Sequence, residues 1–429
     1  MNILIKNCNL ISMSENRNKI EYGIDILIED DKIKQIGKNI DEKKYLKVID
    51  ASNKYVLPGL INTHTHIPMS IFRESVDGYS TQDWLTQKIW PIEDKLEPDD
   101  IYNASLLSCI EMIKTGTTMA NDQYFFAEDI IKAVNKTGIR CELTRVVMDS
   151  DGRMDQRFFE LENLISNYNN KFSNIYISVG IHGLYTASEF CVQRAINLAR
   201  KYNLNVHMHY LENSRETTDI SSNYNGKNPY EIINELFTHT NSIFAHCVKL
   251  SNNDINVFKN LNIKVSHCPI SNLKLGCGIA DITKMIDNNI IVSLGTDGQG
   301  SGSNLDMFET MKFTGLLQKG IKENPKLLSA YEILKLATIN GAKALNKEKI
   351  IGSIEEGKLA DLIIIDLSDI ISQPINEIFA DIVYNAKGTN VITTIVGGNI
   401  LMENRKLISI NENEVIKNCK NILSSKNRN

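Results

Sequence analysis

The stretch VLPGLINTHTH, residues 56–66, is an apolar run that breaks at Pro-Gly and ends in two histidines one residue apart. Side chains alternate along a β-strand, so His64 and His66 lie on the same face. The whole chain holds eight histidines. A pair of this kind is more often made of two hydrogen-bonded core or surface histidines than of site residues, so the rest of the sequence decides its meaning.

The middle of the chain, from about Tyr55 to Asn346, alternates strand-like with helix-like segments. Eight segments have the composition of buried strands, and amphipathic stretches such as 100–115, 188–202 and 330–345 lie between several of them. Eight such units over about 290 residues predict an α/β protein with a (β/α)8 TIM-like barrel. A doubly wound open sheet is the competing layout, but no Gly-Xaa-Gly-Xaa-Xaa-Gly opens a helix after the first strand.

Both ends of the chain are rich in short β-strand patterns, and a hairpin with its turn at Gly397-Gly398 is among them. Residues 1–55 and 351–429 are therefore expected to form the two parts of one small β-sandwich domain, and residues 56–350 the barrel. Pro58-Gly59 marks the entry into the first barrel strand. The polar tail beyond Asn411 predicts a helix.

Polar residues fall at the ends of the predicted strands. In chain order, they are His66, Asp122, Arg145, His182, His209, His246, His267 and Asp297. In a barrel these are the carboxyl ends of the strands, where active sites are built. Histidines with purely structural roles are not expected to recur at the ends of strands. Of the eight histidines, only His239 lies outside the strand segments.

The residue types at these ends predict a metal site. His207 and His209 repeat the spacing of His64 and His66, and Asp297 adds a carboxylate. Three imidazoles and one carboxylate around an open water position suit a hydrolytic Zn²⁺ or Fe²⁺. His207 lies one layer deeper than His209, so it is expected to support a ligand rather than to be one.

Three further residues, Glu212, His246 and His267, are candidates for a catalytic role. Glu212, just beyond the strand end at His209, can serve as the proton shuttle of a metal hydrolase, although a glutamate on a loop is usually only solvated. His246 ends an apolar strand and is either a core histidine or a catalytic one. His267 stays unassigned.

Negative evidence narrows the reaction. His182 stands at the end of the fourth strand, where two-metal barrel enzymes carry a modified lysine, and IYISVGIHGLY contains no lysine. A one-metal site is therefore expected. The deaminase signature His-Xaa-Glu followed by Pro-Cys-Xaa-Xaa-Cys is absent as well.

Composition excludes several classes of protein. Lys and Arg number 47 against 52 Asp and Glu, a net charge of −5, which argues against binding nucleic acid through a basic face. No apolar run is long enough to span a bilayer, and the first residues lack a secretory signal core. The eight cysteines are scattered without a Cys-Xaa-Xaa-Cys pair. A cytoplasmic protein that binds neither membranes nor nucleic acid is expected.

Taken together, the motifs resemble the amidohydrolase superfamily over essentially the whole chain. They are PGLINTHTH, WLTQKIWPIEDKLEPDD, HMHYLENSRE, AHCVKL, HCPISNLKLGCGIA, LGTDGQGSGSNLDMF, ATINGAKALN and GKLADLIIID. More narrowly, they are similar to the methylthioadenosine/S-adenosylhomocysteine deaminase group, which is kin to triazine hydrolases and guanine deaminases.

This resemblance implies roles for individual residues. The implied metal ligands are His64, His66, His209 and Asp297, and the implied catalytic groups are Glu212, His246 and Asp297. The implied substrate contacts are Glu93 at the ribose hydroxyls, His182 and Trp84 along the pocket wall, and Arg145 and Arg153 at an amino-acid carboxylate. Arg157 is an alternative to Arg153.

The resemblance also implies a reaction, hydrolytic deamination of an adenine nucleoside to its inosine product and ammonia. The expected substrates are S-adenosylhomocysteine, 5′-methylthioadenosine, 5′-deoxyadenosine or adenosine, and Glu212 is expected to protonate N1 of the purine. Departures from the group's motifs at Ile181, Gly183, Gly302 and Ser303 leave the substrate open. A guanine, pterin or triazine substrate is the alternative, and a non-catalytic binding barrel is a remote one. A homo-oligomer is possible.

Overall fold

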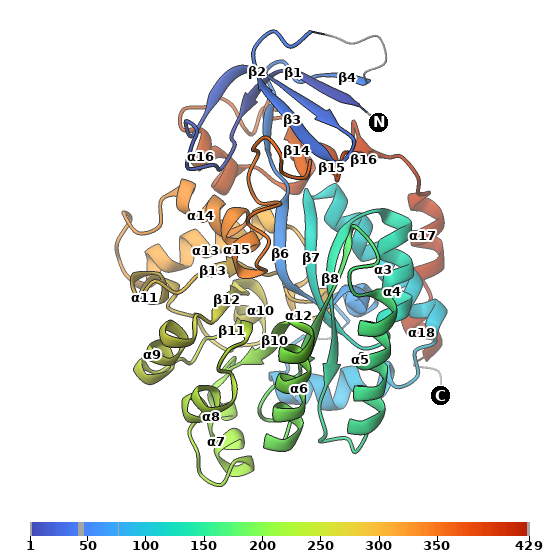
Figure 1. Ribbon diagram of the computed structural model, residues 1–429, viewed down its shortest axis with the longest axis vertical. Helices are drawn as coiled ribbons and strands as arrows, with labels where there is room; N and C mark the ends of the chain where they lie inside the picture. The colour runs from blue at the N-terminus through green and yellow to red at the C-terminus, as the bar shows by residue number, and fades with distance from the viewer. Residues whose placement is uncertain (1, 42–46, 76, 427–429) are drawn as a thin grey trace.

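The parallel sheet of the middle region forms the predicted barrel in a computed structural model that describes residues 2–41, 47–75 and 77–426. Its eight strands lie side by side in chain order (Figure 1). They are β6 (Leu60–Thr65), β7 (Thr117–Tyr124), β8 (Arg140–Val147), β9 (Ile175–Ile181), β10 (Asn205–Tyr210), β11 (Asn241–His246), β12 (Lys264–His267) and β13 (Val292–Leu294).

The first and last strands of this sheet meet. The backbone N–H of Asp297 donates to the carbonyl of His64 at 3.0 Å, and the Thr63 hydroxyl donates to the carbonyl of Leu294 at 2.9 Å. These bonds bring β6 beside β13, so the sheet curls into a nearly closed barrel. The predicted (β/α)8 architecture is confirmed, and the doubly wound alternative is wrong.

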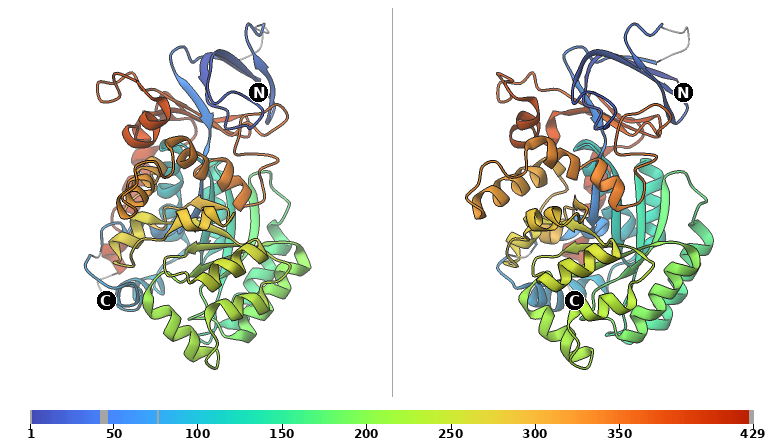
Figure 2. Two further views of the ribbon diagram at one scale, coloured as in Figure 1. Left: turned by 90° about the vertical axis from the view of Figure 1, so that its left-hand side faces the viewer. Right: turned by 60° about the vertical axis from the view of Figure 1, so that its left-hand side comes forward.

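Helices cover the outside of the barrel (Figures 1 and 2). They include α3 (Pro98–Lys114), α4 (Ala127–Thr137), α5 (Met154–Tyr168), α6 (Glu189–Tyr202), α8 (Pro229–Leu236), α9 (Asn252–Leu261), α11 (Ile282–Asp287) and α13 (Met307–Ile321). The predicted helical stretches 100–115 and 188–202 are confirmed as α3 and α6.

The third predicted helical stretch, 330–345, is two helices, α14 (Ala330–Leu336) and α15 (Ile339–Ala344). The break has a local reason, because the carbonyl of Ala337 accepts a hydrogen bond at 2.8 Å from the backbone N–H of Ile61. A continuous helix would use that carbonyl internally, so the break ties the helix pair to the first barrel strand.

Both ends of the chain build a second, mixed sheet, which Figure 1 shows above the barrel. Its nine strands are β1 (Ile3–Leu10), β2 (Glu21–Glu29), β3 (Lys32–Gly37), β4 (Lys47–Asp50), β5 (Tyr55–Pro58), β14 (Leu362–Ile365), β15 (Val391–Val396), β16 (Asn399–Glu403) and β17 (Lys406–Leu407). The expected β-sandwich is thus one hydrogen-bonded sheet, whose apolar core takes side chains such as Ile26 and Ile364 from both ends. The predicted hairpin turn at Gly397-Gly398 joins β15 to β16.

The chain passes from one sheet to the other at Gly59. Pro58 at the end of β5 still pairs with Leu362 of β14, whereas β6 belongs to the barrel. A Cβ at Gly59 would lie 2.0 Å from the Thr118 hydroxyl, so only glycine allows this close approach. Because β6 starts at this junction, the mixed sheet lies at the amino end of the first barrel strand and the carboxyl ends of the strands stay open.

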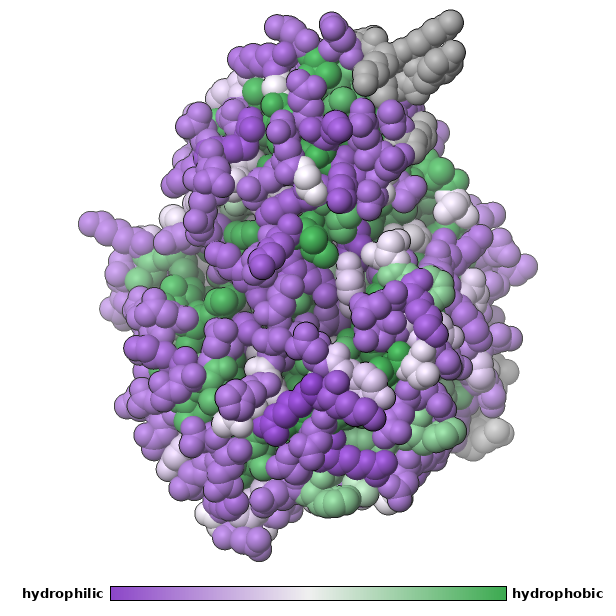
Figure 3. Space-filling view, in the orientation of Figure 1, coloured by the Kyte–Doolittle hydropathy of each residue, from purple (hydrophilic) through white to green (hydrophobic). Residues whose placement is uncertain are grey.

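The polar tail folds as α17 (Glu412–Cys419) and α18 (Ile422–Lys426), and α17 packs along α3, which confirms the predicted helix (Figure 1). Hydrophilic side chains dominate the face drawn in Figure 3, with hydrophobic ones in small scattered groups. Among residues 2–41, 47–75 and 77–426, no helix combines the length and apolar character needed to cross a bilayer.

Candidate active site

The carboxyl ends of the barrel strands bring most of the predicted polar residues together. His66 follows β6, His182 follows β9, and Asp297 lies three residues beyond β13, while His246 and His267 end their strands. The expected strand ends at Asp122 and Arg145 are each wrong by two residues. The reason is that β7 and β8 keep pairing to Tyr124 and Val147.

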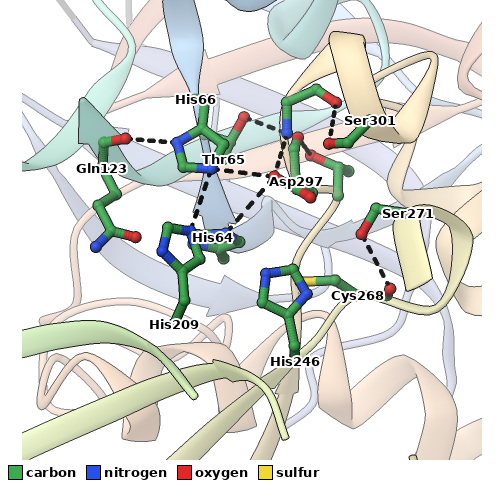
Figure 4. A network of polar contacts seen from close by, with 12 residues as sticks. His64, Thr65, His66, Gln123, His209, His246, Cys268, Ser271, Asp297 and Ser301 are labelled. Carbon is green, nitrogen blue, oxygen red and sulfur yellow. Dashed lines mark hydrogen bonds and ion pairs between the residues drawn. The ribbon is translucent and has the colours of Figure 1, made fainter. Parts of the chain in front are cut away.

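Four side chains from this end of the barrel point into one cluster (Figure 4). They are His64, His66, His209 and Asp297. His66 Nε2 lies 3.1 Å and His64 Nε2 3.6 Å from Asp297 Oδ1, and His209 Nε2 lies 3.4 Å from His66 Nε2. His64 Nε2 is buried and has no hydrogen-bond partner. Since buried polar atoms are almost always paired, this nitrogen and its neighbours fit a ligand held between them. His64, His66 and His209 lie close enough to share one ion, and so do His64, His246 and Asp297. With Asp297 Oδ1 3.1 Å from His66 Nε2, three imidazole nitrogens and one carboxylate oxygen form a donor set that suits Zn²⁺ or Fe²⁺.

The remaining ring nitrogens fix the orientation of the three histidines. His66 Nδ1 donates to the carbonyl of Gln123, and His209 Nδ1 donates to the carbonyl of His182 at 2.7 Å. Because a carbonyl only accepts, the Nε2 atom of each ring keeps its lone pair for the cluster. The third ring, His64, has its Nδ1 2.8 Å from Nε2 of His207. His207 thus contacts a candidate ligand from beneath the cluster, as its deeper position in β10 predicts.

Two residues at the site have left-handed backbone conformations that glycine usually adopts. Asp297 has φ +62° and His246 has φ +72°. Such strain persists only where surrounding bonds impose it, and it gathers at active sites. Asp297 is fixed by the N–H of Gly298, which donates to Oδ1 at 2.7 Å. The next helix, α12 (Gln299–Gly302), begins two residues after Asp297 and contains Gly302. The motif departure at Gly302 therefore lies next to the cluster.

Glu212 and His246 lie next to the cluster as a pair. Glu212 Oε1 is 3.6 Å from His246 Nδ1, and the side-chain amide of Asn272 donates to that nitrogen at 2.9 Å. Burial, together with the charges of Asp297 and Glu216, raises the pKa of Glu212 well above its usual value. Burial lowers the pKa of His246 to about 4. The pair therefore combines a carboxyl group that holds its proton more strongly than a free glutamate with an imidazole that is neutral at pH 7.

A small inner cavity of about 70 Å³ adjoins these groups and opens into an outer chamber of about 910 Å³. The walls of the inner cavity are mainly apolar and aromatic, and Trp84 and His182 are among them. Four residues line both spaces: Trp90, Glu93, Phe125 and Tyr185. Glu93 brings a carboxylate to this junction and Tyr185 a hydroxyl group.

Glu93 lies in α2 (Trp90–Glu93) and is buried at this junction. The Tyr124 hydroxyl donates to its carboxylate. Burial raises the pKa of Glu93 to about 7, although the Tyr124 hydrogen bond and the nearby His66 and Arg157 favour the ionised form. A carboxylate in this place can accept hydrogen bonds from neighbouring hydroxyl groups of a ligand.

The outer chamber holds the three arginines considered from the sequence. Arg145 and Arg157 are buried, whereas the side chain of Arg153 is half exposed at the rim. Arg145 pairs with Glu160, and Arg157 and Arg153 both pair with Asp151. Arg157 rather than Arg153 thus lies inside the chamber with Arg145, which favours the alternative considered from the sequence.

Sequence reasoning missed Gln123, Tyr124 and Asn272. Tyr124 lies two residues after Asp122 on the same strand, so a longer strand prediction would have placed it on the site face. Asn272 lies in α10 (Pro269–Lys274), the helix that follows β12, and no pattern in the sequence marks its contact with His246. Asp122 accepts a bond from the N–H of Ile67 at 2.6 Å and stays outside the cluster.

The chain is similar to known proteins over nearly its whole length. A 5-methylthioadenosine/S-adenosylhomocysteine deaminase of Caldanaerobacter subterraneus is 39% identical, covering 97% of this chain and 96% of the relative. A 5′-deoxyadenosine deaminase of Methanococcus aeolicus is 41% identical, covering 96% of each.

Solved structures share the whole fold. An adenosine deaminase from Xanthomonas campestris with bound zinc superposes with a TM-score of 0.94 at 27% identity, covering 99% of this chain and 98% of that one. A triazine hydrolase from Arthrobacter aurescens (TM-score 0.92, 22% identity, 98% and 99% covered) has the same fold. So does a guanine deaminase from C. acetobutylicum (TM-score 0.85, 23% identity, 93% and 100% covered).

A family match covers most of the chain as well. Residues 55–401 match the Amidohydrolase family, a range that contains the whole barrel and every residue of the cluster. The relatives of about 40% identity match over nearly the full length as well. The chain belongs to the amidohydrolase family.

Proposed function

We propose that this protein is a metal-dependent enzyme that deaminates adenine nucleosides by hydrolysis. The observation that carries the proposal is the Glu212–His246 pair beside the cluster of His64, His66, His209 and Asp297. A carboxyl group with a raised pKa beside a hydrolytic metal site suits purine deamination, since the ring must be protonated as water attacks it. The names of the relatives, both adenine nucleoside deaminases, support the substrate class.

His64, His66, His209 and Asp297 would hold one Zn²⁺ or Fe²⁺. Such a metal, when bound, lowers the pKa of water from 15.7 to about 7 and so supplies hydroxide at neutral pH. The zinc in the related Xanthomonas structure favours Zn²⁺. A single metal is consistent with His182, rather than a lysine, after β9.

The protein's own side chains then handle the protons. The His246 ring orients the attacking water, and Asp297 Oδ1 accepts its proton. Glu212 donates its proton to N1 of the purine, which makes C6 electrophilic and stabilises the tetrahedral adduct. The proton taken from water passes to the exocyclic amine, which leaves as ammonia as its bond to C6 breaks. The C6 hydroxyl loses its own proton to Glu212, which restores that carboxyl group, and the product is the corresponding inosine.

The shape of the cavity supports a nucleoside rather than a free base. Trp84 and His182 give the inner cavity aromatic walls that suit a planar ring, and Glu93 at its mouth can accept hydrogen bonds from ribose hydroxyls. The outer chamber of about 910 Å³ leaves room for a 5′ substituent. A free guanine, pterin or triazine, the alternative substrates, would leave Glu93 and the chamber without a use.

A substrate panel tests the proposal. Purified protein is incubated with 5′-methylthioadenosine, 5′-deoxyadenosine, adenosine, S-adenosylhomocysteine, guanine and a triazine, and ammonia release is followed. Activity on adenine nucleosides is expected, with loss after treatment with a metal chelator and recovery on adding Zn²⁺ or Fe²⁺. Ammonia from guanine or the triazine alone would favour the alternative. A protein that binds no metal and turns over none of the six would be the non-catalytic barrel.

A further inference from the structure

The wall of the outer chamber holds four arginines, and each pairs with a carboxylate. Arg215 pairs with Asp219, and the other three pair with Glu160, Asp151 and Asp94. Glu160 contacts Arg145, Asp151 contacts Arg157, and Asp151 and Asp94 contact Arg153. These side chains are all in the chamber wall. The arginines therefore present no excess of positive charge to a ligand that enters the chamber.

Arg145 is the most completely bound of the four. Its Nε donates to Glu160 Oε2 at 3.0 Å, its Nη2 donates to the same oxygen, and its Nη1 donates to the carbonyl of Val146 at 2.7 Å. Glu160 is itself fixed, because the Gln156 amide donates to Oε1 at 2.9 Å. Every nitrogen of the Arg145 guanidinium is thus bound by the protein.

Arg157 lies beside this pair, against the same aromatic ring. Its guanidinium carbon is 4.6 Å from the centre of the Phe125 ring, and that of Arg145 is 5.5 Å from it. Phe125 also lines the junction with the inner cavity. A substituent that leaves the inner cavity therefore passes an aromatic face and two arginines that already have acidic partners.

We propose that Glu160 is a specificity-determining residue, which makes the enzyme prefer adenine nucleosides whose 5′ substituent carries no carboxylate. This inference rests on the proposed function. A ligand carboxylate that binds Arg145 must either displace Glu160 or use the two N–H groups that the protein leaves over, and in both cases it lies close to the charges of Glu160 and Asp151. Like charges at such short range in a partly buried chamber repel each other. A methyl, hydroxyl or methylthio group meets no such cost and contacts Phe125.

The test compares three nucleosides that differ only at the 5′ end. They are 5′-methylthioadenosine, S-adenosylhomocysteine, and the decarboxylated form of the latter, which keeps the ammonium group. We expect the wild-type kcat/KM for 5′-methylthioadenosine to exceed that for S-adenosylhomocysteine by about tenfold. The decarboxylated compound is expected to resemble 5′-methylthioadenosine.

The variant Glu160→Gln keeps the shape of the side chain and removes its charge. It should reduce the preference against S-adenosylhomocysteine by about fivefold or more. Glu162→Gln is the matched control, because Glu162 is exposed on the same helix, α5, and does not line the chamber. It should leave the preference as in the wild type.

Several outcomes would overturn the inference. They are a wild-type preference for S-adenosylhomocysteine, a poor rate with the decarboxylated compound, or an unchanged preference in Glu160→Gln. If that variant fails to fold, the Kd values of the first two nucleosides for Glu212→Gln enzyme decide instead, and equal or tighter binding of S-adenosylhomocysteine overturns it. Wild-type protein inactive on all three nucleosides would overturn the proposed function, which is a separate result.

Discussion

His64 Nδ1 lies 2.8 Å from Nε2 of His207, and both rings are fully buried. The two histidines come from β6 and β10, the first and the fifth of the eight barrel strands. Asn121 contacts the other side of the His207 ring. This chain of contacts fixes the His64 ring so that its unpartnered Nε2 faces His66 and Asp297.

Replacing His207 with alanine should therefore weaken metal binding. Partners of this kind orient a ligand, and their loss typically costs about 10- to 100-fold in affinity. The affinity is measured by competition with a chromophoric chelator, which reports binding without reference to activity. His239→Asn is the control, because His239 is exposed and lies outside the barrel strands, and Asn tolerates its positive φ. Wild-type affinity in His207→Ala would show that His64 needs no such support.

Glu212→Gln should nearly abolish turnover while leaving the metal bound. The amide has the size of the carboxyl group but cannot give a proton to N1, and general acid catalysis contributes about 10²- to 10⁴-fold. The measurement combines kcat with the metal content of the purified variant. Glu235→Gln, an exposed position on α8, should behave as the wild type. A Glu212→Gln enzyme with more than a tenth of the wild-type kcat would exclude the proposed role.

The metal cluster could be predicted from the sequence because one repeated rule places it. Strand-end residues of a parallel barrel meet at one rim, so the phase of His66, His209 and Asp297 was sufficient. The rule carries no information about side chains that come from helices or loops. Arg157, for example, enters the chamber from a helix, and its depth depends on how α5 packs.

Contacts between distant segments also escaped prediction. The break between α14 and α15 exists because Ala337 bonds to Ile61, which lies far away in the sequence. The partners of Arg145 are of the same kind, since an isolated pattern does not tell whether a cation is free or paired. The sequence therefore predicted the fold and the meeting of the strand-end residues better than the lining of the outer chamber.

Arg140→Ala should destabilise the whole protein. Arg140 at the start of β8 donates to both oxygens of Asp361, at 2.7 and 2.9 Å, and the pair is buried between the barrel and the mixed sheet. Removing one partner of a buried pair leaves an uncompensated charge, which costs about 3–5 kcal/mol of unfolding free energy. Urea unfolding followed by tryptophan fluorescence measures it. The control, Arg194→Ala, removes a surface pair with Asp155 and should cost less than about 1 kcal/mol.

Glu93 should make substrate binding depend on pH near neutrality. Burial raises its pKa to about 7, so the carboxylate that accepts bonds from ribose hydroxyls is present above that pH and is lost below it. We therefore expect KM for 5′-deoxyadenosine to rise as the pH falls through about 7, and to rise less for a 2′,3′-dideoxy analogue, which lacks the hydroxyls.

Tyr124→Phe separates this titration from others at the site. The Tyr124 hydroxyl donates to the Glu93 carboxylate and so favours its ionised form. Without that bond the pKa of Glu93 should increase further, and the midpoint of the KM profile should move to higher pH. The profile of kcat, which depends on Glu212 and the cluster, should move less than that of KM. A KM midpoint that stays in place, or moves to lower pH, would show that another group controls the binding of the ribose.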